Sequence, residues 1–302
     1  MTAPSTIPGL QGVNVAAITP RGKGGDVNFG ATFELIDYLC AARVGGIALF
    51  TAWGEYPALA ADDRARLLYL AVKRSRVPVL AGVGSATLDQ TLGLAREARN
   101  AGAAALLLPP PLFFRYDQPY DEEDLREFYE QFAAQVGSGV AIFLSGGIAM
   151  ETVGQLLAAG CFAGIEDGSG AADSLDRLRA HRGSSTVLSG HDSLLVQARS
   201  AGLGVVSAAA CAAPELTMAL DRAIAAGNGE RIGRLEAKWQ ELIGWLERFP
   251  PPAGVKTAVS LRGIQTGPLP VPLSPGKQKN LEQFREWFKG WLPATRKLAA
   301  HG

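Results

Sequence analysis

The chain has 302 residues, and its 29 Lys and Arg balance 29 Asp and Glu, so the formal net charge at pH 7 is zero. Binding to the phosphate backbone of nucleic acid needs an excess of positive charge, so nucleic acid is excluded as an expected partner. Apolar residues make up 47% of the chain, and no uncharged apolar run reaches the roughly 18–20 residues that a membrane span needs. A globular protein without a membrane partner is expected.

Cysteine usage and the N-terminal segment both bear on the compartment. Cys40, Cys161 and Cys211 lie far apart in mostly apolar stretches, which is typical of reduced core cysteines and not of a disulfide framework. No Lys or Arg precedes Arg21, so the positively charged start of a signal peptide is missing. We therefore expect a cytoplasmic protein.

Short runs rich in Val, Ile, Leu and Ala alternate with longer amphipathic stretches along most of the chain. The short runs predict strands at 13–19, 46–50, 78–82, 104–108, 140–144, 162–166, 186–190 and 204–207. The amphipathic stretches predict helices at 29–42, 62–75, 88–101, 122–136, 151–159, 172–180, 193–200 and 215–226. Strands that are apolar throughout are typical of a parallel sheet covered by helices. Eight such βα units favour a (β/α)₈ TIM barrel, of class α/β, over an open sheet.

The last part of the chain has a different pattern. Helices are predicted at 231–248, 255–261 and 277–300, with a proline-rich connection, GPLPVPLSP, between the last two. The stretch is short and its connection contains few flexible polar residues, so a separate folding unit is not expected. We predict a barrel over residues 1–228 and a C-terminal helical extension over 229–302, packed on the barrel.

The chemistry of a (β/α)₈ barrel is carried by the C-terminal ends of its strands and the loops that follow them. In this chain those positions hold hydroxyl, aromatic and carboxylate side chains and one histidine: Thr51, Trp53, Glu55, Phe113, Phe143, Ser145, Glu166, His191, Asp192 and Ser207. The glycine-rich segments match neither GxGxxG nor GxxxxGK[ST], so no nucleotide cofactor is expected.

Four segments, in order, resemble one known superfamily. They are FTAWGEYPALAADDR, VPVLAGVGSATLDQTLGLAREARNAGAAALLLPPP, GIEDGSG and VLSGHDSLLVQARSAGLGVVSAAACAAPEL. On these segments the chain is identified as a member of the dihydrodipicolinate synthase / N-acetylneuraminate lyase superfamily, the pyruvate-type class I aldolases, from Gly12 to about Pro275. The resemblance implies a lyase that forms a Schiff base between a lysine and a 2-oxo acid. It also implies a homo-oligomer, a dimer or a tetramer.

The chain departs from this superfamily at the residues that carry its chemistry. The lysine of the GIKDSSG motif corresponds to Glu166, and a carboxylate cannot form an imine. The tyrosine of the YNxP-like segment corresponds to Phe143, which has no hydroxyl to relay a proton. The paired threonines of GTTGE, which hold the substrate carboxylate, correspond to Ala52 and Trp53, and the tyrosines usual after the fourth strand are replaced around Phe113.

Two other chemistries could replace the missing lysine: a Schiff base at another lysine, or a bound metal ion. Lys23 is the lysine that we expect on the catalytic side, but its neighbours indicate a solvated turn that would not lower its pKa. His191 and Asp192, with Glu55 and Glu166, could in principle bind a divalent metal ion. No HxH or HExxH spacing supports this, so we expect no metal and no other cofactor, and Glu55 is interpreted as a residue that organises loops.

These observations leave three hypotheses for a protein that binds a small molecule. The first is a divergent lyase or hydro-lyase that acts on a small oxo-acid or hydroxy-acid compound, with Glu166 as general acid or base and no Schiff base. The second is a non-catalytic small-molecule-binding homologue, and the third, less favoured, is an ordinary Schiff-base or metal-dependent aldolase. The residues expected to bind the ligand are Thr51, Ala52, Trp53, Phe113, Phe143, Ser145, His191 and Ser207.

Overall fold

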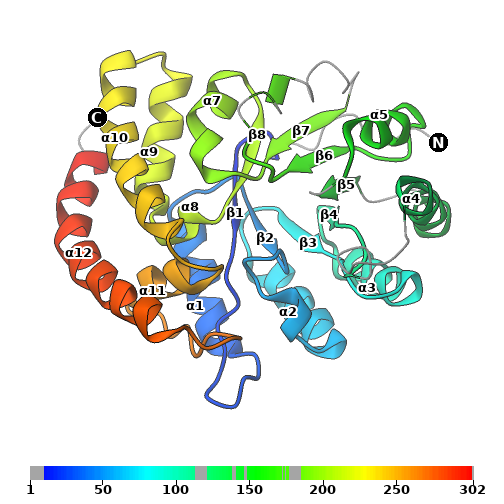
Figure 1. Cartoon of the computed structure of the whole chain (residues 1–302), viewed down its shortest axis with the longest axis horizontal. Helices are drawn as coiled ribbons and strands as arrows, with labels where there is room; N and C mark the ends of the chain where they lie inside the picture. The colour runs from blue at the N-terminus through cyan, green and yellow to red at the C-terminus, as the bar shows by residue number, and fades with distance from the viewer. Residues whose placement is uncertain are drawn as a thin grey trace.

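The computed structural model describes residues 10–112, 121–137, 141–145, 148–171, 173, 175–176 and 185–300. Eight parallel strands form a closed barrel in chain order, with β8 returning to β1 (Figure 1). The strands are β1 (Val13–Ala16), β2 (Gly46–Leu49), β3 (Val79–Gly82), β4 (Ala105–Leu108), β5 (Ala141–Ser145), β6 (Gly164–Asp167), β7 (Thr186–Ser189) and β8 (Gly204–Ser207). The predicted barrel is confirmed, and the predicted strands differ from these mainly at their ends.

Helices surround the barrel on its outer side, as Figure 1 shows. They are α1 (Phe29–Ala41), α2 (Ala61–Arg74), α3 (Leu88–Ala101), α4 (Glu122–Val136), α5 (Met150–Ala158), α7 (Leu195–Ser200), α8 (Ala209–Ala212) and α9 (Pro214–Ala225), with 3₁₀ turns η1 (Tyr56–Ala58) and η3 (Asp192–Leu194). The helix expected at 172–180 falls largely outside the described residues. The short helix α8 was not predicted, because four small residues carry no amphipathic pattern.

Three further helices follow the barrel: α10 (Gly229–Leu246), α11 (Ala253–Ser260) and α12 (Pro275–Ala300). Both α10 and α12 pack against α9, and α11 packs against α8. An aromatic cluster joins α10 to α12: Trp245, Phe249, Phe284, Trp287, Phe288 and Trp291. These helices therefore extend the hydrophobic core beyond the barrel, while the boundary at residues 228/229 stays a prediction.

The expectation that all three cysteines are core residues is wrong for two of them. All three are free, but only Cys211 is buried, whereas Cys40 is partly exposed and Cys161 is exposed. Cys161 lies in the turn between α5 and β6, where the chain returns along the surface to the barrel. Across the described helices, none is both long and apolar enough to span a bilayer.

A buried ion cluster connects the barrel to the C-terminal helices. Glu55 lies just before η1 and forms ion pairs with Lys256 of α11 and, at 3.3 Å, with Arg21 from the loop after β1. The side chains of Glu55 and Lys256 are only 1% and 2% exposed. Burial lowers the pKa of Lys256, and the hydrogen bond and charge of Glu55 act in the opposite direction. Lys256 also donates to the carbonyl of Pro268 at 3.0 Å.

We predict that the substitution Lys256→Met destabilises the protein by about 3 kcal/mol, because removal of one partner leaves a buried charge undercompensated. The matched control is Lys289→Met on α12, whose ion pair with Glu286 is exposed and whose loss costs under about 1 kcal/mol. Urea unfolding measures both variants. If both variants lost the same free energy of unfolding, a structural role for the Glu55 cluster would be contradicted.

Candidate active site

A cavity of about 1120 Å³ lies at the C-terminal ends of the strands. Its lining brings together seven of the residues expected from the sequence: Thr51, Ala52, Trp53, Ser145, Glu166, His191 and Asp192. Phe113, also expected at the site, lies outside the described residues. Phe143 and Ser207 are absent from the described lining, for reasons given below.

Glu166 occupies the end of β6, in register with Ser145 at the end of β5. The Ser145 hydroxyl donates a hydrogen bond of 2.5 Å to Glu166 Oε2. Burial raises the pKa of Glu166 to about 7; the Ser145 hydrogen bond acts against this rise, and the charge of Asp167 adds to it. Near neutral pH the carboxyl group is therefore populated in both its protonated and its ionised form.

Gly190, which directly follows β7, provides the space for the Glu166 carboxyl group. A Cβ atom at Gly190 would lie 1.7 Å from Glu166 Oε1, so any side chain there would displace the carboxylate. The Gly190 amide donates to the carbonyl of Asp167 at 2.6 Å, which holds the ends of β6 and β7 together. The position of the Glu166 carboxyl group is thus set by both neighbouring strands.

Phe143 lies deeper in the barrel than the sequence suggested. It pairs with Gly164, two residues before Glu166, and its side chain is only 1% exposed. Side chains two residues apart on a strand point to the same face, so Phe143 and Ser145 occupy successive layers of the interior. The residue of β5 that contacts Glu166 is Ser145, and Phe143 fills the core below it.

Asp192 forms a second polar centre at the cavity wall. Its carboxylate accepts hydrogen bonds from the Ser207 hydroxyl and, at 3.0 Å, from the Ala209 amide. Burial raises the pKa of Asp192 to about 6, while these hydrogen bonds and the nearby His191 act in the opposite direction. Ser207 therefore holds Asp192 in place and does not reach the cavity. Trp239 of α10 donates to the Asp192 carbonyl at 2.9 Å.

The loop after β2 contributes one wall. The hydroxyl of Thr51 is buried and has no hydrogen-bond partner among the described residues, so it is available to a ligand. Ala52 and the partly exposed Trp53 follow it along the lining. Phe50 and Glu55, which flank these three residues, both adopt positive φ angles of 59°. The loop therefore turns sharply at both of its ends.

An aromatic wall and its supporting arginine were missed by sequence reasoning. Phe50 and Tyr56 line the cavity, and the guanidinium of the buried Arg64 lies over their rings, 5.3 and 5.4 Å from the centroids. Arg64 also donates to the carbonyls of Gly82 and Gly84 at 2.7 and 2.9 Å. A charged residue on an amphipathic helix carries no signal for this inward position.

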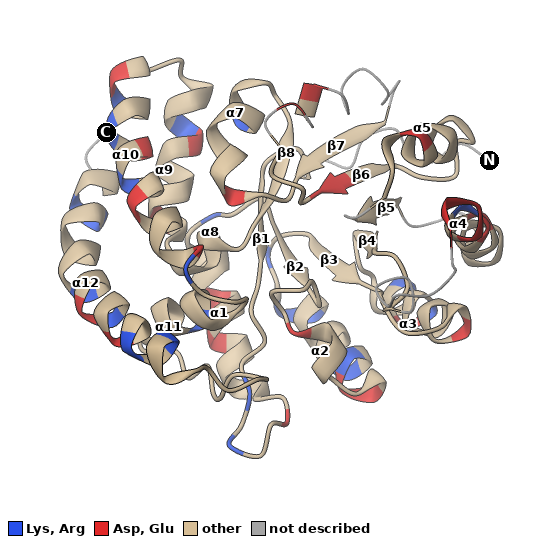
Figure 2. Ribbon diagram, viewed as in Figure 1, with Lys and Arg blue, Asp and Glu red and all other residues tan. Residues whose placement is uncertain are grey.

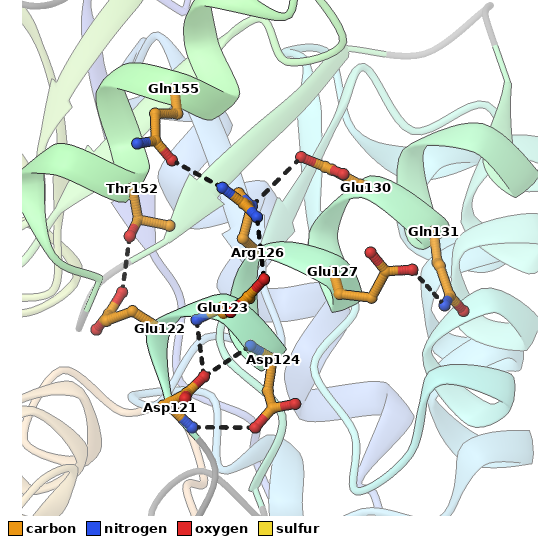
Figure 3. A network of polar contacts seen from close by, with 10 residues as sticks. All are labelled: Asp121, Glu122, Glu123, Asp124, Arg126, Glu127, Glu130, Gln131, Thr152 and Gln155. Carbon is orange, nitrogen blue, oxygen red and sulfur yellow. Dashed lines mark hydrogen bonds and ion pairs between the residues drawn. The ribbon is translucent and has the colours of Figure 1, made fainter.

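The start of α4 contributes acidic residues to the rim. Asp121 caps the helix and accepts from the amides of Glu123 and Asp124, and Glu122 accepts from Thr152 of α5 (Figure 3). Arg126 points away from this rim, toward Gln155 and toward the acidic residues on its own helix (Figure 3). Asp121 and Glu122 line the cavity, which the capping pattern alone does not reveal.

The C-terminal extension forms another part of the wall. Ile243 and Leu246, near the end of α10, and Glu247, Phe249 and Pro251, just beyond it, line the cavity. No sequence signal placed this segment at the barrel mouth, because its position depends on packing between elements distant in the chain. The extension thus borders the site as well as extending the core.

Among the described residues, the cavity lining contains no lysine amine and no metal-ligand cluster. Lys23 is exposed, and Lys256 is engaged by Glu55, so neither supplies an amine to the cavity. Within the described ranges, no group of three or more His, Cys, Asp and Glu side chains could hold a metal ion. Glu55 binds Arg21 and Lys256 and does not line the cavity, which fits its interpretation as a residue that organises loops.

The model of the dihydrodipicolinate synthetase family matches residues 9–290. An uncharacterised DapA-like lyase of Halobacterium salinarum is 31% identical over 273 residues, which cover 88% of each chain. A 4-hydroxy-tetrahydrodipicolinate synthase of Bacillus subtilis is 30% identical over 273 residues, 87% of this chain and 93% of the relative. The structure of dihydrodipicolinate synthase from Aquifex aeolicus superposes with a TM-score of 0.84 at 26% identity, covering 93% and 98% of the two chains.

We predict that Glu166 makes the folded state less stable as the pH rises from about 4.5 to about 7. Across this window the unfolded chain releases the proton of Glu166 while the folded protein retains it, because burial raises its pKa to about 7. Between pH 4 and pH 8, the free energy of unfolding of the wild type should therefore fall by about 3 kcal/mol relative to that of Glu166→Gln. Urea unfolding at both pH values measures this difference.

The control for this prediction is Glu34→Gln, which replaces an exposed carboxyl group on α1. The difference in the free energy of unfolding between this variant and the wild type should stay constant over the same pH range. If Glu166→Gln also showed a constant difference, the carboxyl group would not be held in a desolvated position.

Proposed function

The chain belongs to the dihydrodipicolinate synthetase family, and within it we propose a lyase or hydro-lyase that works by proton transfer at Glu166 without a lysine Schiff base. The observation that carries this proposal is the Glu166 carboxyl group in the cavity wall, with its pKa raised to about 7 by burial. A group of this pKa accepts a proton in one step and returns it in the next at neutral pH.

The proposed reaction is an elimination from a small oxo or hydroxy compound, as in the oxo-acid or hydroxy-acid class suggested by the sequence. The Glu166 carboxylate removes the proton from the carbon beside a carbonyl group. The electron pair of that C–H bond forms a double bond to the next carbon, and the hydroxyl group on that carbon leaves. The same carboxyl group returns its proton to the hydroxyl, which departs as water, so Glu166 ends in its starting state.

The neighbours of Glu166 support this role by orienting it. Ser145 donates to one carboxylate oxygen, and the absent side chain of Gly190 leaves room for the other. The unpartnered Thr51 hydroxyl and His191 line the same cavity and supply polar groups for the substrate oxygens. Ser145 is a positioning residue in this mechanism, and Glu166 is the catalytic residue.

A non-catalytic binding protein is the second candidate function. It is favoured by one observation: the family's imine, tyrosine and paired-threonine positions are replaced here by Glu166, Phe143, Ala52 and Trp53, while the cavity persists. Under this hypothesis the raised pKa of Glu166 is a consequence of burial alone. The proposals that the protein forms a homo-oligomer and lies in the cytoplasm apply equally to both candidates.

We predict that pyruvate followed by borohydride leaves the mass of the protein unchanged, because no lysine lines the described part of the cavity. A family member that retains the lysine of the GIKDSSG motif, treated in parallel, should gain a reduced pyruvyl adduct. Intact-protein mass spectrometry reads out both. A pyruvyl adduct on this protein would overturn the proposed mechanism.

We further predict that Glu166→Gln lowers turnover by about 10²- to 10⁴-fold with the fold intact, the usual contribution of a general acid–base residue. The measurement screens oxo and hydroxy compounds for product by mass spectrometry and then determines the pH–rate profile. In the wild type the rate should rise with pH through about 7, as Glu166 ionises.

The matched control is Asp167→Asn at the adjacent position. Turnover should persist in this variant, and the profile should move to lower pH because a negative charge that raises the pKa of Glu166 is removed. Full activity in Glu166→Gln would exclude proton transfer at this residue. A ligand that stabilises the protein while no compound yields product would favour the binding-protein candidate.

A further inference from the structure

The described part of the cavity wall is acidic. Five carboxyl groups line it, from Asp121, Glu122, Glu166, Asp192 and Glu247, and none of the described lining residues is Lys or Arg. Figure 2 shows acidic residues at the end of β6 and at the start of α4, on the elements that border the cavity. An anionic ligand would meet like charges from several sides, and like-charge contacts of this kind disfavour binding.

Of these five carboxyl groups, Glu247 is the one whose position is least accounted for by structural contacts. It directly follows α10, at the helix C-terminus, where the helix dipole disfavours a negative charge. Among the described residues none forms a hydrogen bond or ion pair with its side chain. By contrast, Asp121 and Glu122 lie at the start of α4, where the dipole and their hydrogen bonds stabilise them. Glu247 is an exposed side chain at the edge of the cavity, and no described cation neutralises its charge.

The arginines near the cavity are already engaged elsewhere. Arg64 is bound by two backbone carbonyls behind the aromatic wall, and Arg126 contacts Gln155 of α5 and Glu130 of its own helix. Arg248, next to Glu247, stacks on Trp245, 4.3 Å from the ring centroid, and donates to the carbonyl of Gly244. None of these described arginines pairs with a wall carboxylate, so they do not neutralise the negative charge of the wall.

Aromatic rings complete the wall. Trp53 and Phe249 line the cavity, from the β2 loop and from the segment after α10. Arg64 lies over Phe50 and Tyr56, but among the described residues no cation lies over Trp53 or Phe249. Ring faces attract cations, tryptophan most strongly, and carboxylates combined with ring faces are a common means of binding organic ammonium groups.

We infer that the ligand of this cavity carries a positively charged nitrogen, bound by the wall carboxylates with Glu247 foremost and by the face of Trp53. The inference rests on the proposed function, since it assigns the substrate class of that same site. The substrate is then an oxo or hydroxy compound that bears an ammonium group on an apolar body. A simple 2-oxo acid anion such as pyruvate lacks the group that this wall recognises.

Isothermal titration calorimetry on the full-length protein tests this with three matched compounds: phenethylamine, 2-phenylethanol and 3-phenylpropionate. They share a phenyl body and differ in charge. At pH 7.5 and low ionic strength, the amine should bind about five- to tenfold more tightly than the alcohol, and the propionate more weakly than either. Raising the salt concentration should narrow the gap between amine and propionate.

Two variants locate the charge preference. Glu247→Gln should weaken amine binding about threefold or more and leave the alcohol unaffected. The control, Glu230→Gln, lies at the other end of α10, where its exposed side chain pairs with Arg234, and it should bind all three compounds as the wild type does. An unchanged amine affinity in Glu247→Gln would remove Glu247 from the site.

Propionate binding as tight as that of the amine would overturn the inference, and so would the absence of binding by all three compounds. These readouts do not involve turnover, so they separate this inference from the proposed function. An amine preference together with full activity of Glu166→Gln would contradict only the proton-transfer mechanism. The loss of activity in Glu166→Gln without an amine preference would contradict only the assigned substrate class.

Discussion

The buried carboxylate of Glu55 is the interaction on which the barrel mouth depends. A buried charge must be paired, and Glu55 is paired twice, by Arg21 from the loop after β1 and by Lys256 from α11. The cluster therefore fixes three segments that are far apart in the sequence. It anchors one end of the loop that carries Thr51 and Trp53. It also holds α11, which directly follows the segment after α10 that lines the cavity.

The second constraint is the register between β5, β6 and β7. It places Glu166 beside Ser145 on one side and beside the empty side-chain position of Gly190 on the other. The carboxyl group is thereby partly withdrawn from water while it borders the cavity, and desolvation disfavours its ionised form. The same geometry that keeps the strands paired thus sets the pKa. A barrel of this kind can change the side chain at a strand end, and hence its chemistry, without a change in its framework.

Much of this arrangement could be predicted from the sequence, and the exceptions have physical causes. Apolar runs of strand length located the barrel strands, and the position of Glu166 at a strand end followed from them. The depth of Phe143 was not predicted, because Phe143 and Ser145 share one face of β5 and only the register with β6 shows which of them lies beside Glu166. Lys256 and Glu247 read as ordinary helix residues, because their surroundings come from packing between elements remote in sequence.

The inferred positive charge of the ligand would be coupled to the charge at the end of β6. In the lysine-bearing relatives, as the resemblance implies, a cationic group at this position meets an anionic oxo acid. Here Glu166 carries the opposite sign, and the inferred ligand carries a positive charge. A cation bound among the wall carboxylates favours the ionised form of a neighbouring carboxyl group. Binding would then lower the pKa of Glu166 from about 7 and convert it into the base that the reaction needs, so the empty site would keep the proton and the occupied site would release it.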